Sequence, residues 1–221
     1  MKNTKNTTRK NLLSHLFMAG YPDEIFMPDE SITRAEVTVM FSRLITEKMD
    51  SNKEYSSSFP DVSEDSWYAP QLGFMEQYGI IEGYEDGSFR PENAVTRAEF
   101  AVIASKFDRL MDSDENVFTD IEENFWAKPY ILLAYKRGWV DGYEDGTFRP
   151  YNAITRAEVI SIVNRMLERS CDKEYLENNP DEIKTYKDVT DEHWAYYDIT
   201  EASNAHLYQK TPDEVWTEIA Q

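Results

Sequence analysis

The stretch GYEDGSFRPENAVTRAEF, residues 83–100, decides the fold of this chain, because the chain contains versions of it three times. A close copy, GYEDGTFRPYNAITRAEV, spans residues 142–159, and a more divergent one, GYPDEIFMPDESITRAEV, spans residues 20–37. Self-similarity at a nearly fixed separation is the signature of a repeat architecture, in which equivalent units pack against one another. The sequence therefore predicts a repeat protein.

A second motif belongs to the same unit. It has an aromatic residue followed by x-Asp-Val or x-Asp-Ile and then, five residues later, a tryptophan. The motif occurs as FPDVSEDSWYAP at 59–70, as FTDIEENFWAKP at 118–129 and as YKDVTDEHWAYY at 186–197. We therefore define a full unit as this motif followed by the Thr-Arg-Ala-Glu stretch.

By this definition the chain has two full units and two half-units. The full units are residues 59–111 and 118–169, residues 11–48 hold only a second half, and residues 186–210 hold only a first half. The C-terminal half ends about where the N-terminal half begins, so we predict that the two meet and complete a third unit. Residues 1–221 would then form one closed domain without exposed repeat ends. The tail, residues 211–221, matches no part of the repeat.

Within each unit the pattern predicts a helix, a loop and a second helix. In the second full unit, Trp126 starts the first helix, Pro129 lies in its first turn, and Gly138 is placed to end it. The second helix begins at about Thr155, and apolar residues then recur every three or four positions. Equivalent apolar faces in the three copies predict a mostly α fold with a shared three-helix core.

The Thr-x-x-Glu pattern of Thr-Arg-Ala-Glu predicts a capping box at the start of each second helix. The arginine has no part in that box, and a cation at the first helical residue is mildly unfavourable beside the helix dipole. Two explanations remain open: an anion site formed by the guanidinium and free helix N–H groups, or a structural ion pair with a nearby carboxylate. The arginines concerned are Arg34, Arg97 and Arg156.

The second motif contains two further candidate sets. The tryptophans precede a helix and lie among acidic residues, so they are either core residues or ligand platforms at a rim; they are Trp67, Trp126 and Trp194. The aspartates either cap the following turn or accept hydrogen bonds from sugar hydroxyls; they are Asp61, Asp120 and Asp188.

Composition excludes several classes of partner. The formal net charge is −19, which argues against nucleic acid and against a broad anionic membrane surface. The single cysteine, Cys171, permits no intramolecular disulfide, and the three histidines are too scattered in sequence to indicate a metal motif. No apolar stretch is long enough to span a bilayer. The N-terminal twenty residues resemble a signal peptide only loosely, so we assign them to the start of the fold.

Together, the two motifs resemble the S-layer homology (SLH) domain over most of residues 11–210. The resemblance implies a pseudo-threefold spindle, with a three-helix central bundle and three helix-loop-helix prongs. It also implies a monomeric, non-catalytic module without a cofactor or metal, which anchors proteins to the bacterial cell wall. The implied partner is an anionic secondary cell-wall polysaccharide, often pyruvylated, that binds in the grooves between prongs.

The resemblance makes the arginine of Thr-Arg-Ala-Glu the central polymer contact and implies, less securely, contacts from the tryptophans and from Gly83 and Gly142. The first copy departs from the pattern, because Glu24 replaces the turn glycine and Met27 replaces an arginine. We therefore expect the Arg34 groove to be the weakest of the three. We also expect Arg97→Ala and Arg156→Ala to weaken binding of the polysaccharide without loss of the fold.

Three alternatives to wall anchoring stay open. The module could keep the fold but have lost the polymer and act as a structural or protein-interaction domain. A calcium site is disfavoured because the acidic turn YEDGSFRPEN, residues 84–93, lacks the ligand spacing of an EF-hand. An enzyme is disfavoured because no nucleophile–base arrangement stands out and threefold repetition suits binding better than a single catalytic centre.

Overall fold

The computed structural model describes residues 12–45, 48–50, 52–107, 117–211 and 213–220. The helices are α1 (Arg34–Leu44), α2 (Ala69–Gln77), α3 (Arg97–Phe107), α4 (Lys128–Lys136), α5 (Arg156–Met166), α6 (Lys173–Asn178) and α7 (Tyr196–Ser203). Short 3-10 turns lie at Pro22–Glu24 and Pro180–Glu182. The strands β1 (Leu12–Ser14), β2 (His206–Thr211) and β3 (Asp213–Ile219) form one antiparallel sheet in that order. The described chain is thus mostly helical, as predicted.

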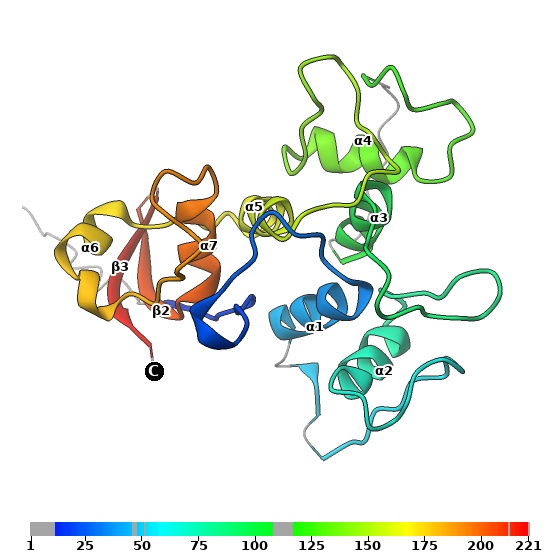
Figure 1. Cartoon of the computed structure of the whole chain (residues 1–221), viewed down its shortest axis with the longest axis horizontal. Coiled ribbons are helices and arrows are strands. Elements are labelled where there is room, and N and C mark those ends of the chain that lie inside the picture. The colour runs from blue at the N-terminus through cyan, green and yellow to red at the C-terminus, as the bar shows by residue number, and fades with distance from the viewer. Residues whose placement is uncertain (1–11, 46–47, 51, 108–116, 212, 221) are drawn as a thin grey trace, which may run out of the picture.

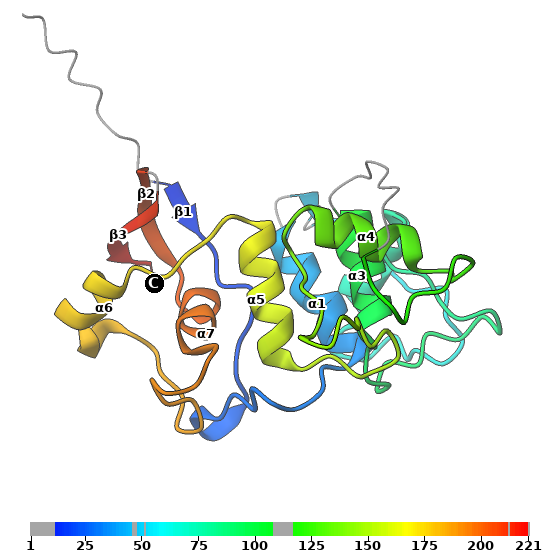
Figure 2. The ribbon, with the colours of Figure 1, turned by 90° about the horizontal axis from the view of Figure 1, so that it is seen from above.

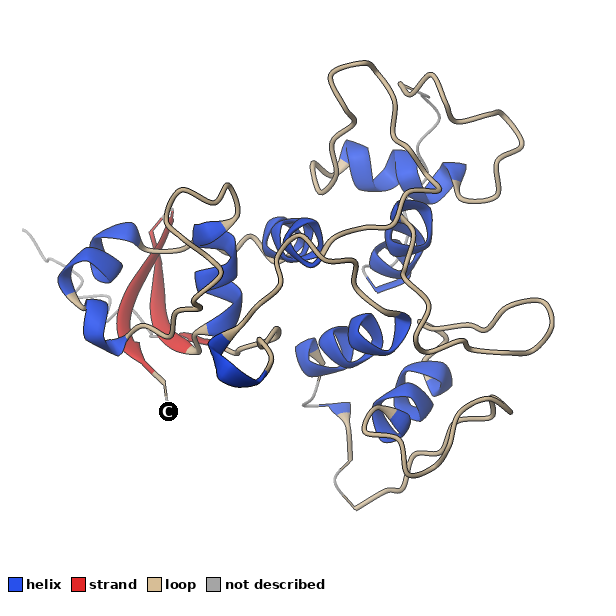
Figure 3. Ribbon diagram, viewed as in Figure 1, coloured by secondary structure: helices blue, strands red, loops and turns tan. Residues whose placement is uncertain are grey.

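The three helices that follow the Thr-Arg-Ala-Glu threonines, α1, α3 and α5, lie at the centre of the molecule (Figure 1). Each packs against one outer helix: α2 against α1, α4 against α3, and α7 against α5. Figure 3 shows long loops around α2 and α4, whereas the lobe of α7 also contains α6 and the sheet. The apolar faces predicted for the central helices are buried, and Phe41 and Phe100 approach one another with ring centroids 5.8 Å apart.

The segments that lead into the central helices form a closed ring of backbone hydrogen bonds. The amide of Ile32 donates to the carbonyl of Ile154 at 3.2 Å, that of Ile154 to Val95 at 2.9 Å, and that of Val95 to Ile32 at 3.0 Å. Because these partners are far apart in sequence, the ring fixes the order in which the central helices meet. The pseudo-threefold relation of the units stays a prediction.

The two half-units contact each other. The carbonyl of Ala202 accepts hydrogen bonds from the amides of Phe17 and Met18, at 3.2 and 3.3 Å, and β1 pairs with β2. The Asp188 carboxylate accepts the amides of Phe26 and Met27. These contacts join residues that we predicted to lie side by side, while the assignment of the whole chain to one domain stays a prediction.

The tail that matched nothing in the repeat forms β3 on the outer edge of the sheet. Figure 2 shows the sheet at the end of the molecule next to α6 and α7, far from α3 and α4. Trp216 of β3 is 3 % exposed and packs with Leu176 and Ile183 in a second, smaller apolar cluster. The tail therefore extends the C-terminal half-unit.

Candidate functional site

The predicted capping boxes are present at the central helices. The hydroxyl of Thr155 accepts the Glu158 amide at 3.2 Å, and the Glu158 carboxylate accepts the Thr155 amide at 2.8 Å. The same reciprocal pair of bonds occurs between Thr33 and Glu36 in α1 and between Thr96 and Glu99 in α3. The threonine and the glutamate thus have the structural role that the sequence indicated.

The anion site expected at free helix N–H groups does not exist, because those groups already have partners. The amides of Arg34 and Ala35 each donate at 3.0 Å, to the carbonyls of Asn93 and Pro91. The other two central helices repeat both bonds, from Arg97 and Ala98 to Asn152 and Pro150, and from Arg156 and Ala157 to Glu30 and Pro28. The third amide of each helix belongs to the capping box. This part of our hypothesis is wrong, since a helix start offers an anion only unbonded N–H groups.

The arginine side chains make the ion pairs that were the second explanation. Arg97 donates from Nε to the Phe148 carbonyl at 2.9 Å, from Nη2 to the Asp141 carbonyl at 3.1 Å, and from Nη1 to Glu158 Oε1 at 2.8 Å. We call this set of three bonds the inter-unit contact, because all three acceptors belong to the following unit. A buried guanidinium with several acceptors of this kind is a structural element.

The other two arginines make equivalent contacts. Arg156 donates to the carbonyls of Phe26 and Ala19 and to Glu36, and Arg34 donates to the carbonyls of Phe89 and Glu82 and lies 3.6 Å from Glu99. Their exposed fractions are 2 % for Arg156 and 7 % for both Arg34 and Arg97. The glutamate acceptors are the capping-box residues, so each box is tied to the arginine of another helix.

This arrangement corrects our expectation about the weakest groove. We expected Glu24 and Met27 to affect Arg34, because all three lie in the first copy. The structure places Arg156 against that divergent turn, through the carbonyls of Ala19 and Phe26, and places Arg34 against the intact turn of residues 82–90. The groove beside the divergent turn is therefore the Arg156 groove, while Arg34 faces a turn that keeps its glycine and its arginine.

Tyrosines at the start of all three turns lie against the arginines, and Tyr143 lies 5.0 Å from the Arg97 guanidinium carbon. The Arg34 guanidinium carbon lies 4.5 Å from the ring centroid of Tyr84, whose hydroxyl donates to Glu99 at 3.0 Å. Tyr21 stands in the same relation to Arg156 and donates to Glu36. Burial and the hydrogen bond to the Glu36 carboxylate raise the pKa of Tyr21 to about 12, so this hydroxyl remains a donor at neutral pH.

The aspartates hold the turns that the arginines contact. Asp61 accepts the amides of Phe89 and Arg90 at 2.8 and 2.7 Å, where Arg90 has a φ of 56°. Burial opposes ionisation of Asp61, but the backbone donors hold its pKa below the usual value. Asp120 and Asp188 accept equivalent pairs of amides. The turn-capping interpretation is confirmed, and a contact with sugar hydroxyls stays a prediction.

We expect Asp120→Ala to lower the free energy of unfolding by about 1.5–3 kcal/mol, because the part-buried amide of Phe148 and the exposed amide of Arg149 lose a charged acceptor. Asp120→Asn should lose less, since one amide oxygen remains as an acceptor. The control is Glu123→Ala, which removes only the surface ion pair with Lys128 and should cost at most about 1 kcal/mol. Urea denaturation measures all three; equal midpoints for Asp120→Ala and Glu123→Ala would contradict a turn-holding role.

Gly83 and Gly142 are required by close packing. A β-carbon at Gly83 would lie 2.4 Å from the Phe59 ring and 2.8 Å from the Ser88 carbonyl oxygen, and one at Gly142 would lie 2.6 Å from the Phe118 ring. Side-chain carbons do not approach other heavy atoms so closely. These glycines let the aromatic residue of the second motif pack on the turn, and a direct ligand contact stays a prediction.

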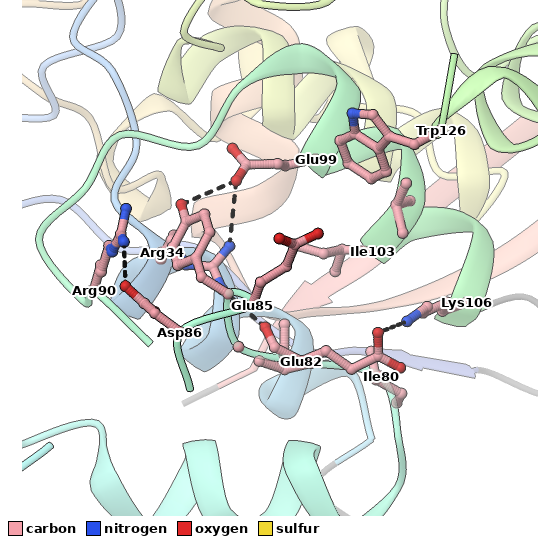
Figure 4. Close-up of a pocket in the computed structure, with 14 residues that line it drawn as sticks. Arg34, Ile80, Glu82, Glu85, Asp86, Arg90, Glu99, Ile103, Lys106 and Trp126 are labelled. Atoms are coloured by element: carbon pink, nitrogen blue, oxygen red, sulfur yellow. Dashed lines mark hydrogen bonds and ion pairs between the residues drawn. The ribbon is translucent and has the colours of Figure 1, made fainter. Parts of the chain in front are cut away.

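The tryptophans are exposed, so the core interpretation is wrong for them. Trp67, Trp126 and Trp194 have exposed fractions of 62, 56 and 60 %. Trp126 lines a cavity of about 670 Å³ together with Arg34, and the two side chains lie on opposite sides of it (Figure 4). Trp194 lines a smaller cavity, of about 170 Å³, together with Arg97. Each of these grooves thus combines a buried arginine with an exposed tryptophan from the second unit further along the chain.

Each of the two grooves also contains a second cation, which our sequence analysis missed. Lys106 lies 2.7 Å from Glu82 in the first groove, and Arg165 lies 2.8 Å from Asp141 in the second. Both carboxylate side chains are 70 % exposed. The sequence contains a pattern that could have predicted these cations, because a basic residue stands nine positions after each Thr-Arg-Ala-Glu arginine, including Arg43 after Arg34.

Among the described residues, one group of side chains could hold a metal ion: Glu201, His206 and Glu214. These residues line neither of the two grooves. In the part of the chain that the structure describes, no helix combines the length and the apolar character needed to cross a membrane.

Comparison with known proteins gives consistent matches. The chain is 36% identical over 200 residues to a cellulosome-anchoring protein of Acetivibrio thermocellus, which covers 87% of this chain and 43% of that protein. It is 33% identical over 203 residues to cell surface glycoprotein 1 of the same organism, and the match covers 87% of this chain and 8% of that protein. It is 34% identical over 167 residues to an amylopullulanase of Thermoanaerobacterium thermosulfurigenes, and the match covers 72% of this chain and 9% of that protein. The chain spans less than half the length of each of these relatives.

A family model described as the S-layer homology domain matches residues 10–38, 58–101 and 117–160, together more than half of the chain. The three segments contain all three Thr-Arg-Ala-Glu motifs, while the C-terminal half-unit lies outside them. The chain belongs to the S-layer homology domain family.

Proposed function

We propose that this chain is a non-catalytic module that anchors a protein to the bacterial cell wall by binding an anionic secondary wall polysaccharide in its grooves. The observation that supports the proposal most is the repeated composition of the grooves. Arg34, Lys106 and Trp126 line one cavity, and Arg97, Arg165 and Trp194 line the other. An aromatic face beside two cations suits a charged saccharide, since the sugar ring stacks on the indole and its anionic group meets a cation.

The location and the partner follow from the same proposal. Relatives named for cellulosome anchoring and for the cell surface place the module at the bacterial cell surface. The module acts as one chain and needs no cofactor for this role. Since the chain matches only part of each relative, the activity of any longer protein that contains it is a separate matter; the relatives include an enzyme, the amylopullulanase.

The two cations of a groove have different roles in the proposal. Two of the five N–H donors of Arg34 make hydrogen bonds to carbonyl groups of the described structure, and Nη1 pairs with Glu99 only at 3.6 Å, which leaves N–H donors for a ligand. Lys106 is paired with an exposed carboxylate, and exposed ion pairs contribute little free energy. An anionic group of the polymer can therefore replace Glu82 at Lys106, while the arginine donates its remaining hydrogen bonds without leaving its internal partners.

A second candidate function is a structural or protein-interaction module that has lost the polymer. One observation favours it, namely that all three arginines already bind internal acceptors. The arginine motif would then be retained for packing alone. Under this candidate, loss of a groove tryptophan or of Lys106 would leave wall binding unchanged.

The test is a pull-down of the purified chain with cell wall, before and after the non-peptidoglycan polymer is removed. We expect binding only before removal, and about 30-fold weaker binding for Trp126→Ala, the effect of a residue that contributes about 2 kcal/mol. Lys106→Ala should weaken binding to a lesser extent. Tyr151→Ala is the control, since Tyr151 is 75 % exposed and lines neither groove. Equal binding of all variants, or binding to stripped wall, would reject the proposal.

A further inference from the structure

Three metal-ligating side chains meet in the interior near the sheet. Glu201 lies on α7, His206 starts β2, and Glu214 lies on β3. Their exposed fractions are 0, 0 and 4 %, and one potential ligand atom from each lies within 4.8 Å of the other two. Charged side chains are almost never fully buried unless they are paired, so two carboxylates and an imidazole in this position require a partner.

In each of the three residues, one atom is held in place and another is left without a hydrogen-bond partner. Glu201 Oε1 accepts from Arg169 Nε at 2.8 Å, and Glu214 Oε2 accepts from the Ser170 amide. The other carboxylate oxygens, Glu201 Oε2 and Glu214 Oε1, are buried without a partner, as is His206 Nε2. This is the usual pattern of metal ligands, in which outer hydrogen bonds orient the side chains and the ligating atoms point inward.

The environment of His206 decides which ring nitrogen is available. Nδ1 lies 2.8 Å from the Asn204 carbonyl oxygen, which can only accept, so Nδ1 carries the proton and Nε2 has a lone pair. Nε2 is 3.6 Å from Glu201 Oε1, too far for a hydrogen bond. The Trp216 ring stacks on the imidazole with centroids 3.8 Å apart and fixes its plane.

A lone pair that faces two carboxylates is electrostatically unfavourable unless a cation lies between them. Arg169 supplies one positive charge at Glu201 Oε1, so the cluster has a net charge of −1 when both carboxylates are ionised, as metal ligands are. The cluster therefore retains the charge and the free donor atoms that a bound cation requires.

We propose that Glu201, His206 and Glu214 form a buried site for a first-row divalent transition metal of the Zn²⁺ type. An imidazole and two carboxylates are ligands of such ions, whereas Ca²⁺ and Mg²⁺ take oxygen ligands. In a tetrahedral zinc site with bonds of about 2.0–2.2 Å the ligand atoms lie about 3.3–3.5 Å apart, so ligand atoms separated by up to 4.8 Å close in by up to about 1.5 Å on binding. The site then connects α7, β2 and β3, and Ser14 of β1 donates to Glu201. The bound metal therefore stabilises the junction of the two half-units.

The whole chain, treated with EDTA and dialysed, is titrated with ZnCl₂, and bound metal and melting temperature are measured. We expect one zinc ion per chain and, at a hundredfold excess over Kd, a rise in Tm of about 5–10 °C. Mg²⁺ should cause no rise. Glu214→Gln and His206→Gln should each weaken zinc binding by at least about 100-fold. Glu218→Gln is the matched control, because Glu218 is an exposed glutamate on the same strand.

Three results would overturn the site. These are a folded EDTA-treated chain that binds less than one zinc ion, a Glu214→Gln variant that binds zinc as the parent does, and a Glu218→Gln variant that loses binding equally. If the variants fail to fold, the test uses the parent chain alone, and the visible absorption spectrum of its Co²⁺ complex is measured. Intense bands near those of tetrahedral cobalt support the site, and the spectrum of aqueous cobalt rejects it. None of these readouts involves the cell wall, so the proposed function is tested separately.

Discussion

Replacement of Arg156 by alanine is expected to lower the free energy of unfolding by about 3–5 kcal/mol, the usual cost of removing one partner of a buried ion pair. Arg156 is 2 % exposed, and its loss leaves the Glu36 carboxylate and the carbonyls of Phe26 and Ala19 without their donor. This revises our sequence-based expectation that the fold would barely change. Thermal and urea denaturation measure the effect.

Two further variants make the Arg156 experiment specific. Arg156→Lys keeps the charge but cannot supply the planar set of donors. We therefore expect its free energy of unfolding to lie between that of the parent and that of Arg156→Ala. Arg149→Ala removes an exposed arginine that pairs with Asp145, and it should cost at most about 1 kcal/mol. If Arg156→Ala is no less stable than Arg149→Ala, the inter-unit contact has no structural role.

Deletion of residues 186–221 is expected to destabilise the whole molecule by about 5–10 kcal/mol, comparable with the total stability of a domain. Val189 and Ile199 belong to the main core, and burial of each such side chain contributes about 1.5–3 kcal/mol. The deletion also removes the partners of Phe17, Met18 and Gly20 in the N-terminal half-unit. Calorimetry should show a single transition at much lower temperature, or none.

A shorter deletion separates closure from the sheet edge. Removal of residues 213–221 takes away β3 and the Glu214 ligand but leaves α7 and β2 in contact with residues 12–18. In EDTA, where the proposed metal contributes nothing, this chain should lose much less stability than the longer deletion. An unchanged melting temperature after deletion of residues 186–221 would show that the C-terminal half-unit is not needed for closure.

These stability effects bear on how wall binding should be tested. An arginine variant that binds the polymer poorly could do so because the turn that it supports has moved, and not because a ligand contact is lost. Trp126 and Lys106 line the same groove, but Trp126 is 56 % exposed and Lys106 pairs with an exposed carboxylate. Their variants therefore report on the groove with the least effect on the fold.

The sequence by itself determined the parts of the fold that depend on neighbours a few residues apart. Thr155 and Glu158 form their capping box, and Gly87 and Gly138 have positive φ values of 80° and 71° where a turn and a helix end were predicted. Such features obey rules of local geometry, since a cap or a turn needs only the next three or four residues. The contact between the half-units was also predictable, because the repeat reveals which segments are equivalent.

Only the tertiary structure decided which turn each arginine contacts, which side chains face solvent, and what the tail does. Arg156 contacts the turn that carries Glu24, although the two are far apart in sequence, and Trp126 is exposed where the sequence favoured a core position. Glu201, His206 and Glu214 meet because β3 folds back on β2 beside the end of α7. The physical reason is that these contacts join residues far apart in sequence and depend on the path of the chain between units. The repeat pattern does not specify that path.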